Sequence, residues 1–304
     1  MAMNQAINWR SIDVAQRLAE LSKTDIVDVG DCMDDYFALL QRNEAHGIRM
    51  PWSKLDGLFE LRPATLSLMI GYSGHFKSTI ASQIILGAMD QGKKVGLASL
   101  ELTKGEIYQQ LVEIASTTND PTKAWVTRFN AWARSKLVIY DRVDSIAPED
   151  ATSMMIAMHD MDCDLIVLDA LMMCGLETED YGSEKDFSQT VQAIAKLTKR
   201  AVLLLHHCRK PGGARGQMQV PDKYDAMGSS NLANISNNVL VAWHNKDKAH
   251  TANAGGEVDD AIPDFMFKID KHRGGKYEGQ VGLYQHRQCR GFCNTRQRTL
   301  RPVL

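Results

Sequence analysis

Short, almost continuously apolar runs recur along the chain after Gly47 and alternate with longer stretches of mixed polarity. Strands covered on both faces must be apolar at nearly every position, so these runs predict buried strands. The strand candidates are 65–71, 93–101, 136–141, 164–169, 201–207 and 238–244. Helices are expected between them, over 77–91, 104–116, 149–161 and 185–199. Alternating strands and helices predict an α/β fold with a doubly wound, mostly parallel sheet.

The two ends of the chain depart from this alternation. Near the end, FMFKIDKH and GQVGLYQH predict an antiparallel hairpin added to the sheet. Near the start, apolar residues recur at helical spacing, which predicts a short helical extension over 1–44 before a main domain over 45–304. This extension could pack on its own domain or dock on a neighbouring subunit, and the sequence leaves both open.

Composition narrows the class of protein. The 304 residues are 44% hydrophobic, and Lys+Arg 35 against Asp+Glu 37 leaves a formal charge of -2, so any nucleic-acid contact must come from local basic clusters. The first residues lack a basic flank followed by an apolar run, and no segment approaches about 18 uninterrupted apolar residues. We therefore expect a cytoplasmic protein with no membrane partner and with reduced cysteines.

The first strand candidate runs into GYSGHFKST and then an apolar helix, which is the context of a phosphate-binding P-loop. In the pattern G-x-x-x-x-G-K-[ST], Gly71, Lys77 and Ser78 match, but Phe76 takes the place of the second glycine. A left-handed conformation would cost this residue about 1–2 kcal/mol, and Gly74 can supply flexibility instead. The alternative is a loop that has lost nucleotide binding. The expected nucleotide-binding residues are Gly71, Gly74, His75, Phe76, Lys77, Ser78 and Thr79.

Polar residues end three of the predicted strands, where open α/β sheets bind ligands. Asp169 ends DLIVLD and is expected to hold Mg²⁺ together with the hydroxyl of Ser78. Glu101 ends KKVGLASLE and is placed to deprotonate an attacking water, although it could instead belong to the N-cap of the next helix. His207 ends AVLLLHH and could sense a γ-phosphate or be structural. The expected ligands are ATP, dTTP or another NTP, with Mg²⁺.

Together these segments resemble the DnaB-like replicative helicases of RecA-like fold, especially the helicase half of phage primase-helicases. The resemblance runs from about residue 45 to 293. It rests on the lead-in GIRMPWSKLDGLFELRPATLSLMIGYSGHFKST, on KKVGLASLE for the catalytic glutamate, on CDLIVLDAL for the Mg²⁺ carboxylate, and on LLLHHCRKPGG. The last segment resembles the one that carries the phosphate-sensing histidine of the phage branch, which implies that role for His207.

Two further segments take their meaning from the resemblance. CRKPGGARGQMQVPDKYDAMGSS resembles the central DNA-binding loop, which implies that Arg209, Lys210 and Arg215 bind phosphates of single-stranded DNA without reading bases. An ordinary surface loop is the alternative. IDKHRGGKYEG resembles a late Lys-x-Arg motif, which implies that Lys271 and Arg273 reach the γ-phosphate held by a neighbouring subunit.

The resemblance implies a ring, expected to be a hexamer, that moves 5′ to 3′ on single-stranded DNA and unwinds duplex during phage replication in an infected bacterial cell. A primase and a DNA polymerase are the candidate partners. Two departures from the family pattern, Phe76 and Met227, bear on turnover. Two alternatives therefore stay open: a RecA-like recombination or annealing ATPase, and a catalytically weak accessory or loader subunit of a helicase.

Overall fold

The computed structural model describes residues 28–34, 36–37, 47–175, 181–209, 219–228 and 230–304. The chain divides into two units, Met1–His46 and Gly47–Leu304. In the first unit a 3-10 turn, η3 (Val29–Asp31), is followed by helical residues. The predicted helical extension otherwise falls outside the described residues.

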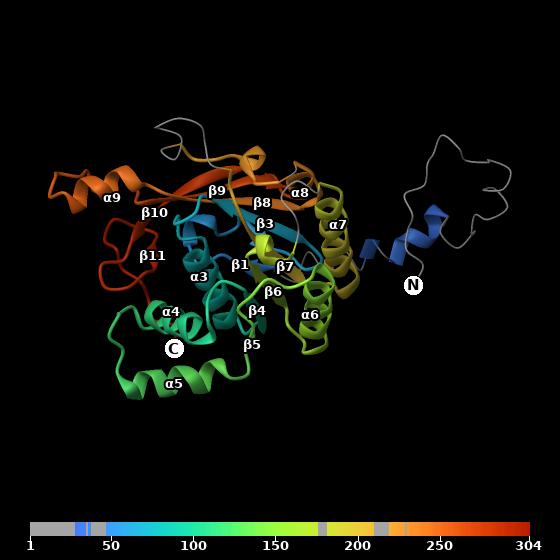
Figure 1. The fold of residues 1–304 in the computed structure, drawn as a ribbon, viewed down its shortest axis with the longest axis horizontal. Helices are drawn as coiled ribbons and strands as arrows, with labels where there is room; N and C mark the ends of the chain where they lie inside the picture. Colours follow the sequence, from blue (N-terminus) through green and yellow to red (C-terminus); the bar gives the residue numbers. More distant parts are fainter. Residues whose placement is uncertain (1–27, 35, 38–46, 176–180, 210–218, 229) are drawn as a thin grey trace. The chain divides into compact units, whose positions relative to one another are not determined.

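The second unit is built on one mixed sheet of nine strands in the order β11-β10-β9-β8-β3-β7-β6-β4-β5 (Figure 1). Its six central and outer strands β8, β3, β7, β6, β4 and β5 run parallel, and β9, β10 and β11 continue the sheet antiparallel. The strand bounds are β3 Leu66–Gly71, β4 Val95–Ser99, β5 Leu137–Tyr140, β6 Leu165–Asp169, β7 Ala201–His207, β8 Asn238–His244, β9 Phe265–His272, β10 Gly279–Gln285 and β11 Phe292–Cys293. A separate pair, β1 (Ile48–Arg49) with β2 (Glu60–Leu61), lies in the lead-in.

Helices cover both faces of the sheet. Side chains of α3 (Lys77–Asp90) and α4 (Lys104–Ser116) share one core with alternate strand residues such as Leu203 and Leu205. Side chains of α6 (Pro148–Asp160) and α7 (Tyr181–Thr198) share the other core with intervening residues such as Leu204. The continuous apolar strands are therefore explained by burial on both sides, and the predicted doubly wound sheet is confirmed.

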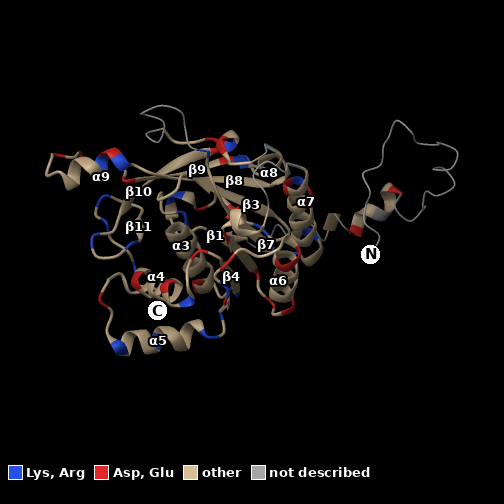
Figure 2. Ribbon diagram, viewed as in Figure 1, with Lys and Arg blue, Asp and Glu red and all other residues tan. Residues whose placement is uncertain are grey.

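The sequence pattern missed several short elements and one longer helix. The short helices α8 (Ser230–Ile235) and α9 (Lys246–Asn253) flank β8. The longer one, α5 (Lys123–Ala133), carries basic and no acidic side chains (Figure 2). It packs through Phe129, which is fully buried with ring centroids 5.6 Å from Trp125 and 5.7 Å from Tyr108. Among the described helices, none is both long enough and apolar enough to cross a membrane.

Replacing Phe129 by Ala should lower the free energy of unfolding by about 3–5 kcal/mol, because it removes a buried aromatic ring and leaves a cavity. Urea unfolding of the whole chain measures this. The exposed neighbour Asn130→Ala is the matched control and should stay close to the parent. Equal stability of the two variants would show that α5 does not pack on the main core.

Candidate functional site

The loop after β3 curls at the carboxyl edge of the sheet. Gly71 ends the strand and pairs in register with His207 of β7. A Cβ atom on Gly71 would lie 2.4 Å from the carbonyl oxygen of Ala242, so only glycine fits at this position. Gly74 has φ 71° and Phe76 has φ 60°, and α3 begins directly afterwards at Lys77. The loop therefore turns twice through the left-handed region before the helix.

Phe76 adopts the backbone conformation that a glycine would supply. Its φ of 60° and ψ of 25° are left-handed, which costs a non-glycine residue about 1–2 kcal/mol. Its ring packs edge-on against His244 at 4.8 Å and against Phe292 at 5.5 Å between centroids. Aromatic packing of this kind offsets the backbone cost. The departure from the P-loop pattern thus leaves the curl of the loop in place.

Lys77 brings a buried ammonium under the loop. Its Nζ donates to the carbonyl oxygens of Gly71 at 3.0 Å and Tyr72 at 3.1 Å, and lies 3.3 Å from Nδ1 of His207. Burial lowers the pKa of this lysine, and the nearby carboxylate of Asp169 opposes the shift. Its described partners within hydrogen-bond distance are uncharged acceptors, so an incoming phosphate oxygen would not have to displace an ion pair.

His207 lies between Lys77 and Glu101. Its Nε2 is 3.6 Å from Oε1 of Glu101, while its Nδ1 faces the lysine ammonium. An ammonium can only donate, so this network assigns the acceptor role to Nδ1 and the proton to Nε2. The hydrogen bond from His207 is the largest cause that lowers the pKa of Glu101, so the glutamate is ionised at neutral pH.

Glu101 is not the cap of the following helix. That role belongs to Thr103, whose hydroxyl accepts from the backbone N–H of Glu106 while the Glu106 carboxylate accepts from the backbone N–H of Thr103. This reciprocal arrangement is a capping box. The side chain of Glu101 is 39% exposed and stays available at the edge of the site.

Asp169 supplies a second carboxylate at the end of β6, and its backbone pairs with Ser99 of β4. The residue is buried, and burial raises its pKa, while a hydrogen bond from Ser78 opposes the shift. A carboxylate beside a hydroxyl is a set of hard oxygen donors of the kind Mg²⁺ prefers. Ser78 and Asp169 therefore fit the metal that accompanies a nucleotide triphosphate. Thr79 is buried and lies one residue further into α3.

His75 faces the protein interior rather than the mouth of the loop. It is fully buried, and its Nδ1 accepts from the backbone N–H of His244 at 3.1 Å. Burial, and then the positive charge of Lys246, lower its pKa to about 3, so the ring is neutral. Only the backbone of His75 is placed to meet a phosphate. The sequence pattern did not reveal His244, Phe292 or Lys246 as residues of this region, although His244 and Lys246 follow the carboxyl end of a predicted strand.

The segment that resembles a DNA-binding loop is closed at its base. The backbone N–H of Arg209 donates to the carbonyl oxygen of Asp225 at 2.8 Å, and that of Met227 donates to His207 at 2.9 Å. The ring of His206 bonds the carbonyl of Met227 at 2.8 Å, and the guanidinium of Arg209 donates to the carbonyl of Gly228. Met227 thus contributes its backbone, and the loop begins and ends beside His207. Lys210 and Arg215 lie outside the described residues.

Lys271 and Arg273 are at the opposite edge of the sheet from this site. Lys271 pairs in register with Val239, near the start of β8, whereas the loop follows the end of β3. The Lys271 ammonium donates to the carbonyl oxygens of Ala233 at 2.8 Å and Asn234 at 2.9 Å, and Arg273 donates to Asn234 at 3.3 Å. Burial, and then the charge of Arg273, lower the pKa of Lys271 to about 8. These residues do not complete the site of their own chain.

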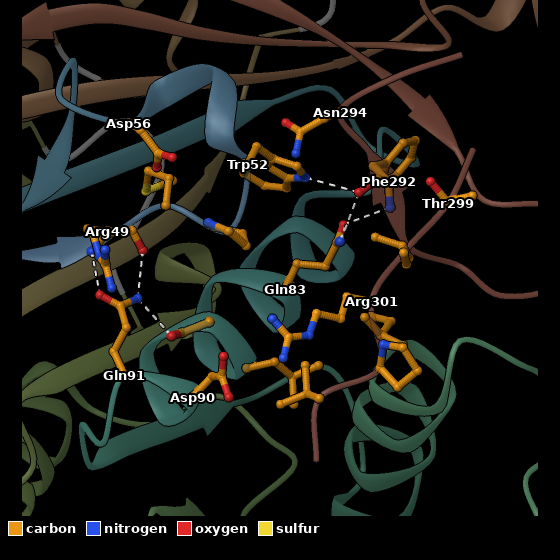
Figure 3. Close-up of a pocket in the computed structure, with 18 of the residues that line it drawn as sticks. Arg49, Trp52, Asp56, Gln83, Asp90, Gln91, Phe292, Asn294, Thr299 and Arg301 are labelled. Carbon is orange, nitrogen blue, oxygen red and sulfur yellow. Dashed lines mark hydrogen bonds between the residues drawn. The ribbon is translucent and has the colours of Figure 1, made fainter. Parts of the chain in front are cut away.

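A pocket of about 650 Å³ lies elsewhere, along the second half of α3 (Figure 3). The last residues of the chain and the lead-in around Trp52 form its other walls. Trp52 and Gln83 both donate to the carbonyl of Phe292 at 3.0 Å, which ties these walls together. No residue of the loop after β3 lines this pocket, so it is separate from the phosphate-binding loop.

Comparison with known proteins agrees with this geometry. The family model described as AAA domain matches residues 55–213. The solved ATPase domain of the gene 40 product helicase superimposes with a TM-score of 0.73 at 16% identity, covering 88% of this chain and 100% of that domain. A DnaB-like replicative helicase, solved in a study of its interactions with primase, superimposes with a TM-score of 0.69 at 15% identity, covering 92% of this chain and 74% of that one. The search of curated protein sequences gave no match. The predicted RecA-like fold of DnaB-like helicase domains is therefore confirmed.

Replacing Phe76 by Gly and by Ala separates backbone strain from packing. Both variants lose the ring contacts, but only glycine relaxes the left-handed backbone, so Phe76→Gly should be more stable than Phe76→Ala by about 1 kcal/mol. Urea unfolding of both variants measures the difference. A more stable alanine variant would contradict the left-handed conformation of this residue.

Replacing His207 by Ala should raise the pKa of Glu101 toward that of an ordinary glutamate, because the hydrogen bond that favours its ionised form is lost. The lowered pKa of Glu101 contributes stability that is present at neutral pH and is lost as pH falls through the folded-state pKa, and this contribution should shrink in the variant. NMR titration of carboxyl-labelled glutamates measures the shift. Glu106 is the internal control, since its pKa is lowered by Thr103 and should not move.

Proposed function

Since this chain belongs to the AAA domain family, we propose that it is the motor domain of a ring-forming replicative DNA helicase. In this proposal hydrolysis of ATP or another NTP drives movement along single-stranded DNA and unwinding of the duplex ahead. The fold common to DnaB-like helicase ATPase domains supports the assignment. It distinguishes this chain from nucleotide-binding folds built on other sheet orders.

The observation that carries the proposal is the chain of contacts from Lys77 through His207 to Glu101. A cation for phosphate, a histidine and an ionised carboxylate meet at the carboxyl edge of the sheet, and Asp169 and Ser78 lie on the same edge. Groups in this arrangement can bind a triphosphate at one end and activate water at the other.

In the proposed reaction each residue has one role. The backbone of the loop and the Lys77 ammonium neutralise the β- and γ-phosphates, and Ser78 and Asp169 hold Mg²⁺, which stabilises charge on the phosphate oxygens. Glu101 accepts a proton from water as the water oxygen attacks the γ-phosphorus. The bond between the γ-phosphorus and the bridging oxygen breaks, and the nucleoside diphosphate leaves with the electron pair.

His207 is proposed to transmit the state of the γ-phosphate to DNA. A phosphate that draws Lys77 toward itself removes the contact at Nδ1 of His207. The backbone of the same histidine accepts from Met227 at the base of the loop, so a shift of the strand end reaches the DNA segment directly. Arg209, Lys210 and Arg215 would then bind DNA phosphates, independently of sequence and weakly at high salt.

Lys271 and Arg273 are proposed to act on the site of a neighbouring subunit. Their place at the far edge of the sheet fits a contribution in trans, and two cations at a γ-phosphate stabilise the charge that develops during transfer. A closed ring, which we propose to be a hexamer, gives every subunit such a neighbour. We further propose 5′ to 3′ movement and contacts with a primase and a DNA polymerase in an infected bacterial cell.

Two alternatives have distinct consequences. A recombination or annealing ATPase of the same fold would form open filaments, which electron microscopy distinguishes from closed rings. An accessory subunit would bind nucleotide without hydrolysing it, and the left-handed Phe76 is the feature that raises this possibility.

Nucleotide hydrolysis by the whole chain should be stimulated by single-stranded DNA and abolished by Lys77→Ala. Arg273→Ala should reduce turnover by about 10³-fold, the value of a cation supplied in trans. Release of phosphate, with and without DNA, measures both. The exposed Arg128→Ala on α5 is the matched control and should hydrolyse like the parent. Nucleotide binding by the parent without any hydrolysis would support the accessory subunit instead.

Mixing the two inactive variants tests the contribution in trans. A mixed ring contains interfaces that join an intact Lys77 from one subunit to an intact Arg273 from the next, so part of the activity should return. No recovery from rings that electron microscopy shows to be mixed would mean that both residues act within one chain.

A further inference from the structure

Lys246 is a second cation at the phosphate-binding loop. It is the first residue of α9, whose first turn carries both basic and acidic side chains (Figure 2). Its Nζ donates to the carbonyl oxygen of Ser73 at 3.5 Å and lies 3.6 Å from the position that a Cβ atom on Gly74 would occupy. Its charge also adds to the lowered pKa of His75, after burial. The ammonium therefore lies over the crest of the loop.

Local structure does not account for the charge of Lys246. The N-terminus of a helix is positive, so a cation in the first turn is unfavourable for α9. The N-cap of this helix is Asn245, which accepts from the backbone N–H of Lys248. Lys248 itself pairs with Asp264 at 2.8 Å, whereas in the described part of the chain no carboxylate pairs with Lys246. Its contact with one carbonyl at the limit of hydrogen-bond distance leaves two donors of the ammonium unused.

The order of the strands places Lys246 on a particular side of the loop. The hydrolytic groups His207, Asp169 and Glu101 follow β7, β6 and β4, all on one side of β3, whereas Lys246 follows β8 on the other. Neighbouring strands are about 4.8 Å apart, so the ends of β7 and β8 are separated by about 10 Å. If the γ-phosphate faces Glu101, the other end of the nucleotide must leave the loop toward β8.

We propose that Lys246 binds the nucleoside end of the nucleotide, donating to an oxygen of the ribose, the base or the α-phosphate next to them. This inference rests on the proposed function, because it assumes that the γ-phosphate lies at Glu101. The lysine stem would cover the apolar edge of the ligand while the ammonium supplies the polar contact. Lys246 would thus recognise nucleosides, and the loop with Lys77 would recognise phosphates.

Paired ligands test the inference on the whole chain. ADP and inorganic pyrophosphate both present two phosphates to the loop, but only ADP carries a nucleoside. Lys246→Ala and Lys246→Met should weaken ADP binding by about tenfold, the worth of one charge-assisted hydrogen bond, and leave pyrophosphate binding unchanged. Calorimetric titration measures ADP binding, and displacement of a labelled nucleotide measures pyrophosphate binding. Lys246→Arg should restore ADP binding.

Lys123→Ala is the matched control, because Lys123 is also the first residue of a helix behind a side-chain cap but belongs to α5. It should bind both ligands like the parent. Equal weakening of ADP and pyrophosphate by Lys246→Ala would mean that the lysine only braces the carbonyl of Ser73, and unchanged binding of both would mean that it contacts neither ligand. Either result overturns the inference while the proposed function stands. Failure of the parent to bind ADP would overturn both.

Discussion

The buried ammonium of Lys77 is the charge around which the carboxyl edge of the sheet is organised. A lysine without water needs acceptors on every side, and the carbonyls of Gly71 and Tyr72 and the ring of His207 supply them. These acceptors come from two strands paired in register, so the position of the ammonium depends on the sheet as a whole. Glu101 enters the same network through His207, which couples phosphate binding to the carboxylate that acts on water.

Phe76 shows how a loop can keep its shape after losing a glycine. The family pattern places glycine where φ must be positive, and this chain holds phenylalanine at φ 60° there. The ring contacts His244, which follows from β8, and Phe292 of β11, so strands distant in sequence support one strained residue. Because β11 is also tied to α3 through Gln83, the loop, the helix and the edge of the sheet depend on each other.

Strong local patterns accounted for most of the fold and part of the site. The strands from β3 to β8 and the helices α3, α4, α6 and α7 were predictable, because burial on both faces forces continuous apolar runs with amphipathic helices between them. The helix α5 was missed because three of its apolar positions are aromatic residues that pack on one another more than on the sheet. Lys246 was missed because a lone lysine after a strand carries no pattern of its own.

The sequence by itself determined the class of fold, the loop that follows β3 and the identity of the polar residues that end the strands, since these depend on local order along the chain. Only the tertiary structure decided which of those residues meet. The strand order put His207 between Lys77 and Glu101, Lys246 across the loop from both, and Lys271 with Arg273 at the far edge. Strand order follows from the packing of the whole sheet, and no segment of a sheet contains the information that selects its neighbours.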